Sequence, residues 1–198
     1  MEHNAAKRPG DWRAHYNLAL VRDKSGRLAE AKAEYERVLE LDPKLPFIHE
    51  KLGVVLLKQN RPEDAKRRFE EAIRLDPEFA EAHTGLGSAR LGAGDAAGAA
   101  ASYAEAARLA PRLPEAHANL AVAYTHLGRL DDAEAECREA IRLRPGFALA
   151  HANLGLVLAR REKWEAAAAA LEEALRLDPK LADARRNLDA VRSRLGGR

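Results

Sequence analysis

The sequence predicts an all-α protein made of antiparallel helix pairs that repeat every 34 residues. Proline recurs at this interval six times, at Pro9, Pro43, Pro77, Pro111, Pro145 and Pro179. Leucine recurs at the same interval, at Leu18, Leu52, Leu86, Leu120, Leu154 and Leu188. Only 5% of the 198 residues are aromatic, and alanine supplies much of the 46% that are hydrophobic, which favours closely packed helices over a sheet. One helix pair cannot bury its apolar face alone, so we expect neighbouring pairs to stack into a continuous core.

Each 34-residue unit has the same order of elements: a helix, a turn, a second helix and a proline. In the first helix, a small residue follows the repeated leucine and lets the neighbouring helix approach closely; these residues are Ala19, Gly53, Gly87, Ala121 and Gly155. In the second helix, a repeated alanine is followed four residues later by a larger side chain; these are Tyr35, Phe69, Tyr103, Cys137 and Leu171. Proline ends each second helix because it lacks an N–H group and restricts the residue before it. The predicted units are 12–45, 46–79, 80–113, 114–147 and 148–181.

The turn inside each unit needs a residue that accepts the left-handed conformation. Gly26, Asn60, Gly94 and Gly128 meet this need in the first four units. Glu162 stands there in the fifth unit, so we expect that turn to be strained or differently shaped.

The third unit is rich in glycine, which lowers helix stability by roughly 0.5–1 kcal/mol per interior position relative to alanine. Its glycines are Gly85, Gly87, Gly92, Gly94 and Gly98. We therefore expect residues 85–105 to be the internal segment least protected from amide exchange.

The two ends differ from the repeated units. Residues 1–11 are polar and are predicted to form a flexible segment. Residues 182–198 are predicted to form a capping helix and tail, since an apolar stripe at helical spacing faces a charged side; the stripe consists of Ala184, Leu188, Val191 and Leu195. The cap carries five arginines against two aspartates but no stacking aromatic residue, so we interpret it as a solvated surface.

Charge and cysteine content exclude several classes of protein. The net charge is only +2 with histidine neutral, which predicts no binding to nucleic acid. The single cysteine, Cys137, cannot form an intrachain disulfide and stands where a core side chain is expected. We find no secretory signal and no apolar run of roughly 18 residues, so we expect a cytoplasmic protein without membrane insertion.

Histidine also recurs once per unit, at His15, His49, His83, His117 and His151. Equivalent positions in stacked helices lie roughly 8–10 Å apart, too far for the ligands of one metal ion, so these rings are predicted to pack rather than bind metal. If they are buried and neutral, acidification near pH 6 should destabilise the fold. The chain has no phosphate-binding loop, nucleophile elbow or zinc-binding helix motif. We therefore predict no enzyme activity, no catalytic residue, no metal and no cofactor.

With its Leu-small, Ala and Pro positions at a 34-residue period, the chain resembles the tetratricopeptide-repeat (TPR) family over about residues 12–181. The resemblance implies a right-handed superhelical solenoid of antiparallel helix pairs. It also implies a non-enzymatic scaffold that binds an extended or amphipathic segment of a partner protein in a concave groove. The first helix of each pair would line that groove.

The resemblance assigns the partner-binding residues by their offset in the repeat. One row consists of polar side chains at one offset, namely Asn17, Lys51, Asn119, Asn153 and Asn187. Asparagine can hydrogen-bond the backbone of an extended peptide, although it is also common at this offset throughout the family. Val122 and Leu156 belong to an apolar strip in the second half of the groove, whereas Tyr16, Phe47 and Glu50 make the first half mixed.

Other functions within this family remain open or are excluded. The carboxylate clamp that grips acidic chaperone tails needs lysine and asparagine where this chain has Tyr16, Leu20, Glu81 and Gly85, so we exclude that function. One alternative is a homo-oligomer, a dimer or filament assembled through the groove or the N-terminal edge. Another is that the chain is the recognition arm of a larger enzyme or of a secretion or assembly complex. The sequence does not identify the partner.

Overall fold

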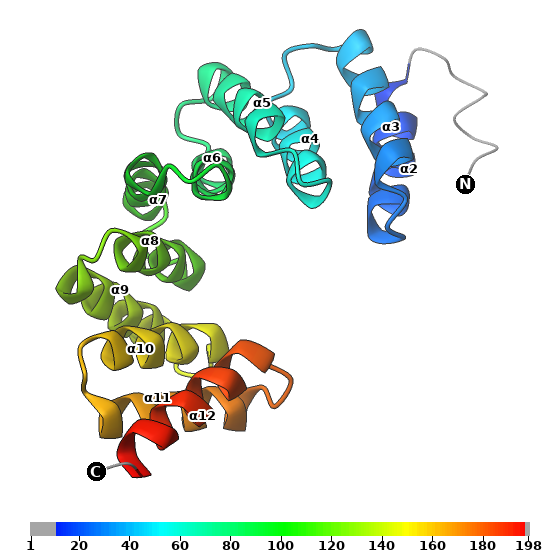
Figure 1. Cartoon of the computed structure of the whole chain (residues 1–198). Coiled ribbons are helices and arrows are strands. Elements are labelled where there is room, and N and C mark those ends of the chain that lie inside the picture. Colours follow the sequence, from blue (N-terminus) through cyan, green and yellow to red (C-terminus); the bar gives the residue numbers. More distant parts are fainter. Residues whose placement is uncertain (1–10, 197–198) are drawn as a thin grey trace. The chain divides into compact units, whose positions relative to one another are not determined.

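A computed structural model describes residues 11–196 as a series of helices joined by short turns (Figure 1). The prediction of a flexible segment at 1–11 lies outside these residues except for Asp11, whose side chain caps the first helix by accepting a hydrogen bond from the Arg13 N–H (3.1 Å). Within the described part, eleven helices and no strands are found: α2 (Trp12–Lys24), α3 (Leu28–Leu41), α4 (Pro46–Lys58), α5 (Pro62–Leu75), α6 (Ala80–Gly92), α7 (Ala96–Leu109), α8 (Pro114–His126), α9 (Leu130–Leu143), α10 (Ala148–Arg160), α11 (Trp164–Leu177) and α12 (Ala182–Gly196).

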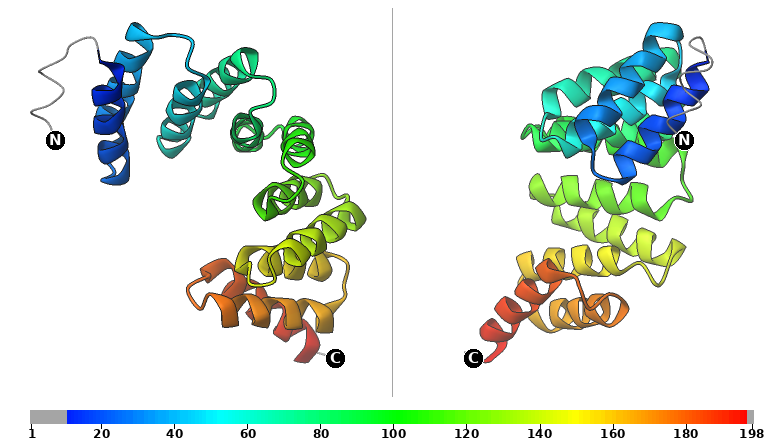
Figure 2. Two further views of the ribbon diagram at one scale, coloured as in Figure 1. Left: turned by 180° about the vertical axis from the view of Figure 1, so that it is seen from behind. Right: turned by 90° about the vertical axis from the view of Figure 1, so that its right-hand side faces the viewer.

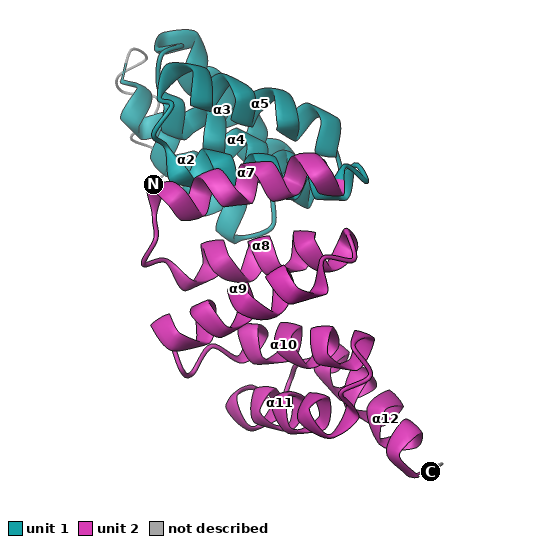
Figure 3. Ribbon diagram, turned by 90° about the vertical axis from the view of Figure 1, so that its left-hand side faces the viewer, with its two compact units in different colours: residues 1–95 teal, residues 96–198 magenta. Residues whose placement is uncertain are grey.

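The chain divides into two compact units, residues 1–95 and 96–198 (Figure 3). Unit 1 contains α2 to α6, and unit 2 contains α7 to α12. Inside unit 1, α2 packs beside α3 and α4 beside α5; inside unit 2, α8 packs beside α9 and α10 beside α11 (Figure 2). The boundary between the units lies within the glycine-rich third repeat, between α6 and α7.

The turn inside each helix pair closes with the same hydrogen bonds whether or not it contains glycine. In the first turn, Gly26 has a φ of +76°, the Arg27 N–H donates to the Arg22 carbonyl (2.9 Å), and the Gly26 N–H donates to Asp23 (3.0 Å). This is the Schellman motif, which satisfies the last carbonyls of a helix. The fifth turn has the same pair of bonds around Glu162, which has a φ of +58°. Its shape is therefore that of the other turns, and glutamate occupies a backbone conformation that glycine adopts at lower cost.

A histidine side chain is hydrogen-bonded to the linker between successive helix pairs. The Nε2 atoms of four rings donate to the carbonyl oxygen of the proline six residues earlier, at 2.9–3.1 Å; these are His49, His83, His117 and His151. A carbonyl oxygen only accepts, so Nε2 carries the proton in each ring. The repeated histidine thus ties the first helix of each pair to the end of the preceding pair.

The core of unit 1 is built around Phe69 of α5, whose side chain is fully buried. Its ring occupies the space left by two glycines, Gly53 on α4 and Gly85 on α6. A Cβ atom at Gly53 would lie 2.7 Å from the Phe69 Cζ atom, and one at Gly85 would lie 2.6 Å from Cδ1 and closer still to Cε1 and Cζ. Gly85 therefore makes room for a core side chain, besides lowering the helix propensity of its own segment.

The core of unit 2 continues to the end of the described chain. Leu171 of α11 packs where a Cβ at Gly155 would lie 2.5 Å from its Cγ atom. The predicted cap is α12, which packs on α11 and buries Ala184, Leu188 and Val191 in the same cluster. No helix within residues 11–196 is long and apolar enough to cross a membrane.

A buried carboxylate anchors the fifth turn of unit 2. Glu134 of α9 is only 4% exposed, and its oxygens lie 2.5 Å from Arg138 and 2.5 Å from Arg161, with Lys163 at 3.3 Å. Burial opposes ionisation of this carboxyl group, but the Lys163, Arg138 and Arg161 cations outweigh it and hold the pKa of Glu134 below its usual value. Because Arg161 and Lys163 flank Glu162, this network holds the turn in which glutamate replaces glycine.

Candidate functional site

The sequence-predicted site residues all lie on the first helices of the pairs or on α12, which occupies the same offset. Tyr16 and Asn17 lie on α2, and three further residues, Phe47, Glu50 and Lys51, lie on α4, so this group belongs to unit 1. The group in unit 2 consists of Asn119 and Val122 on α8, Asn153 and Leu156 on α10, and Asn187 on α12. Their role in partner binding remains a prediction in both units.

In unit 1 the predicted residues include an aromatic cluster. The ring centroids of Tyr16 and Phe47 are 5.6 Å apart at an interplanar angle of 89°, and Trp12 lies 5.9 Å from Phe47. The Arg13 guanidinium lies 4.8 Å from the centre of the Trp12 ring. These rings are only partly buried, and edge-to-face contacts of this kind stabilise the cluster itself.

Glu50 is the least accessible of the predicted site residues, at 6% exposure. Burial raises the pKa of its carboxyl group, opposed by the Lys51 ammonium 3.1 Å away. The fully buried Tyr35 hydroxyl has no hydrogen-bond partner among residues 11–196. The Glu50 carboxyl group and the Tyr35 hydroxyl therefore lie within the helix packing of unit 1. The other predicted site residues of this unit are half-buried or exposed and offer more surface to a partner; these are Tyr16, Asn17, Phe47 and Lys51.

In unit 2 the first helices form a contiguous series, because α10 contacts both α8 and α12. Asparagines occupy one offset of all three helices, at Asn119, Asn153 and Asn187. The Asn153 Nδ2 group donates to the Ala118 carbonyl on α8 at 3.4 Å, so this amide is used in part to join two repeats. Within the described part of the chain, the side chains of Asn119 and Asn187 make no hydrogen bond, which leaves their amides available.

Aliphatic side chains lie beside these asparagines. Val122 and Leu156 are half-buried, each three residues after an asparagine on its helix. Leu149, near the start of α10, is 52% exposed, the most exposed of the large hydrophobic residues in the described chain. Residues separated by three or four positions share one helix face, so amide and apolar groups alternate along this surface.

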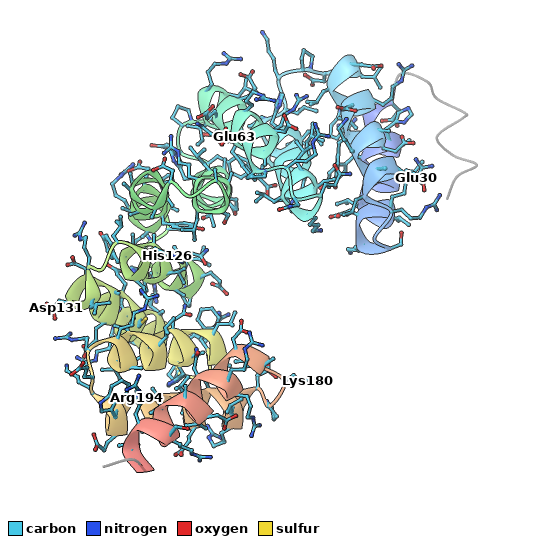
Figure 4. All side chains as sticks on the ribbon, viewed as in Figure 1. Glu30, Glu63, His126, Asp131, Lys180 and Arg194 are labelled. Atoms are coloured by element: carbon cyan, nitrogen blue, oxygen red, sulfur yellow. The ribbon has the colours of Figure 1, made fainter. Side chains whose placement is uncertain are left out.

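Sequence reasoning missed a third row on the same faces. His126, Arg160 and Arg194 lie seven residues after the asparagines, in the last turns of α8, α10 and α12, and all three are exposed. Figure 4 labels His126 and Arg194. Arg160 reaches α8, where its Nη1 group donates to the Thr125 carbonyl at 2.7 Å. We call these three residues the cation row. Its signal was present in the sequence as a basic residue or histidine at a 34-residue spacing.

The three rows define the first-helix face of unit 2: the asparagines, the aliphatic residues Val122 and Leu156 with Leu149, and the cation row. This face has hydrogen-bonding amides, exposed apolar area and positive charge, which are the groups that hold a polypeptide segment.

The single cysteine of the chain lies outside this face. Cys137 is fully buried in α9, and burial raises the pKa of its thiol to about 12. In residues 11–196, no three side chains able to ligate a metal ion lie together.

Comparisons with known proteins agree on the architecture. Residues 1–195 match the model of a family described as the cilia and flagella-associated protein 70 C-terminal domain, a TPR family. No match was found among curated proteins.

Several solved structures are similar over most of this chain. YrrB, described as a TPR protein with an unusual peptide-binding site, is 24% identical, with a TM-score of 0.70 over 93% of this chain and 95% of its own. TTC0263, a thermophilic TPR protein in Thermus thermophilus, is 22% identical, with a TM-score of 0.74 over 91% and 98% of the two chains. A chain of the APC/C hetero-tetramer Cut9–Hcn1 is 19% identical, with a TM-score of 0.85, but only 38% of that chain is covered, against 96% of this one. These likenesses confirm the predicted fold class, an all-α solenoid of antiparallel helix pairs.

Proposed function

The chain belongs to the TPR family of the cilia and flagella-associated protein 70 C-terminal domain, and from this premise we propose that it is a non-enzymatic scaffold that binds a segment of a partner protein on its first helices. The bound segment is extended or amphipathic. Its apolar side chains contact Val122 and Leu156, and its backbone is held by the asparagine row. The proposed compartment is the cytoplasm, with which the free Cys137 thiol is compatible.

One observation carries this proposal: accessible apolar and amide groups alternate on adjacent helices of unit 2. Leu149 is 52% exposed, and the amides of Asn119 and Asn187 have no partner among the described residues. A capping helix and a packed core already stabilise this unit, so the accessible groups are not needed to complete it. The similarity to YrrB, a protein described as having a peptide-binding site, supports the same reading.

The test is capture of partner proteins by the full chain from native lysate, compared with a Val122→Glu variant and a Leu156→Glu variant. Each substitution places a charge in the apolar row. We expect the amount of captured partner protein to fall by at least about tenfold, as it does when a central apolar contact is lost. Ala135→Glu is the matched control, because it adds the same charge at an exposed position of α9, a second helix. Equal capture by Val122→Glu and wild type would overturn the proposal, provided that circular dichroism shows all variants folded.

The same variants, studied by light scattering, separate the proposal from self-assembly. If the chain binds itself through these helices, light scattering across a concentration series will show a mass that increases in the wild type and not in Leu156→Glu. A mass that stays that of a monomer, together with variant-sensitive capture, supports binding of a different protein.

A further inference from the structure

We propose that the segment bound by unit 2 is acidic along one edge, with its carboxylates facing the cation row of His126, Arg160 and Arg194. This inference rests on the proposed function and specifies the chemistry of the partner. The proposed function names apolar and backbone contacts only. The added statement is that charge determines which segments bind, and in which orientation.

The first argument is that the arginines of the cation row lack a carboxylate of their own. Of the eleven other described arginines of unit 2, nine form an ion pair with aspartate or glutamate: Arg108, Arg129, Arg138, Arg142, Arg144, Arg161, Arg176, Arg186 and Arg192. Among the described residues of this unit, no carboxylate pairs with Arg160 or Arg194. The two arginines stand at the same repeat offset, Arg160 on α10 and Arg194 on α12. Because α10 contacts α12, their uncompensated charges lie on neighbouring helices.

A cation in the last turn of a helix is also favoured by the helix dipole, which gives the row an alternative explanation. The second helices provide the comparison. Arg142 and Arg176 stand in the last turns of α9 and α11, yet each is bound by a glutamate three residues earlier, at 2.6 Å. The helix dipole therefore accounts for cations at these ends and does not account for the missing carboxylates of the cation row.

On α4 of unit 1, the residue at the same offset is neutralised inside the fold. Lys58 of α4 occupies the offset of the cation row, and its Nζ group lies 2.7 Å from Asp23 of α2. In unit 2, Thr125 and Ala159 stand at the offset of Asp23, and neither has a carboxylate. Arg160 instead donates one N–H to the Thr125 carbonyl, which orients its guanidinium and leaves further donors for a ligand.

The positions of the three rows also predict how the acidic groups of the partner are spaced. Asparagine, aliphatic residue and cation follow one another at i, i+3 and i+7 on α8 and α10, so the three rows run side by side across the helices. Adjacent helices pack roughly 8–10 Å apart. A polyproline-like segment rises about 3.1 Å per residue with three residues per turn, so every third side chain lies on one edge at about 9 Å spacing. A carboxylate at every third position would therefore meet successive cations while the next position faces Val122 and Leu156.

The probes are three nine-residue peptides that repeat Glu-Leu-Ser, Gln-Leu-Ser or Lys-Leu-Ser, titrated into the full chain by fluorescence anisotropy at low salt. We expect the glutamate peptide to bind about tenfold more tightly than the glutamine peptide, as two exposed charge pairs would give, and the lysine peptide to bind most weakly. Raising the salt to about 0.5 M should remove most of the difference, because the charges are exposed.

Two variants assign the effect to the cation row. The double substitution Arg160→Gln with Arg194→Gln should make the glutamate and glutamine peptides bind equally. Arg185→Gln is the matched control, since Arg185 is an exposed arginine of α12 that also lacks an ion pair but stands at a different offset. It should leave the preference for glutamate unchanged.

The outcomes separate this inference from the proposed function. If the glutamate and glutamine peptides bind wild type equally and Leu156→Glu abolishes both, the charge inference is wrong and the proposed function stands. If none of the peptides binds, the inference is overturned, and the capture experiment decides the proposed function independently. A single-stranded oligonucleotide that binds through Arg160 and Arg194 while the glutamate peptide does not would also overturn it, in favour of a nucleic-acid partner.

Discussion

Replacing Gly85 with alanine should destabilise unit 1, although alanine is the better helix former. Gly85 lies inside α6, and its missing side chain leaves space for the ring of Phe69, which is fully buried. An added Cβ atom would lie 2.6 Å from the Phe69 Cδ1 atom, well inside van der Waals contact. Because the ring is enclosed on all sides, it cannot rotate away without disturbing the core.

The magnitude follows from two opposing effects. Overpacking a core by one methyl group costs about 1–3 kcal/mol, whereas replacing an interior helical glycine with alanine stabilises by roughly 0.5–1 kcal/mol. The difference is a net loss of up to about 2.5 kcal/mol. For a chain of this length, each kcal/mol corresponds to a change in melting temperature of about 2–4 °C.

Gly92→Ala is the matched control, because it makes the same substitution at the end of the same helix. A Cβ atom at Gly92 would meet only the Pro62 Cβ atom, at an ordinary contact distance of 3.6 Å. We expect this variant to be unchanged or more stable, by up to about 1 kcal/mol. The assay is thermal unfolding followed by circular dichroism for both variants.

A second substitution tests whether Phe69 is the cause. Phe69→Leu should destabilise wild type but cost less in the Gly85→Ala background, because the smaller side chain relieves the overlap. The reasoning is refuted if Gly85→Ala melts at or above the wild-type temperature, or if the two substitutions are additive.

Three further predictions concern single side chains. Burial is the main cause of a lowered pKa at His49, so the folded state binds fewer protons than the unfolded state. The contribution of His49 to stability should therefore be complete above about pH 6.5 and fall as the pH is lowered to 5.5. His49→Gln should reduce this pH dependence of the melting temperature, measured in melting curves recorded across that range. Glu134→Gln should lower the free energy of unfolding by about 1–3 kcal/mol in urea titrations, because it leaves Arg161 and Lys163 without their shared carboxylate; an unchanged midpoint would mean that the network contributes nothing. Glu162→Gly should raise the melting temperature by about 1–4 °C, because glycine adopts the observed φ of +58° without steric cost, and a lower melting temperature would contradict this account of the turn.

Much of the fold could be predicted from the sequence because its signals are local. Pro43 and Gly26 act through their own backbone preferences, so their positions mark helix ends before any packing is known. The repeat period then places each following element. The site could be predicted only as a set of offsets, since the identity of Asn119 or Val122 at its offset indicates a helix face and not the accessibility of that face.

The sequence by itself therefore determined the number, order and pairing of the helices and the rows of residues that share a helix face. Only the tertiary structure decided which members of those rows are occupied by contacts within the fold. Glu50 is buried against neighbouring helices, and the ring of Phe69 fills the space left by the missing side chain of Gly85. Arg160 has no carboxylate partner, although most arginines of unit 2 have one. The physical reason is that burial and ion pairing depend on atoms from other repeats brought within a few ångströms, whereas helix boundaries depend on the dihedral angles of adjacent residues.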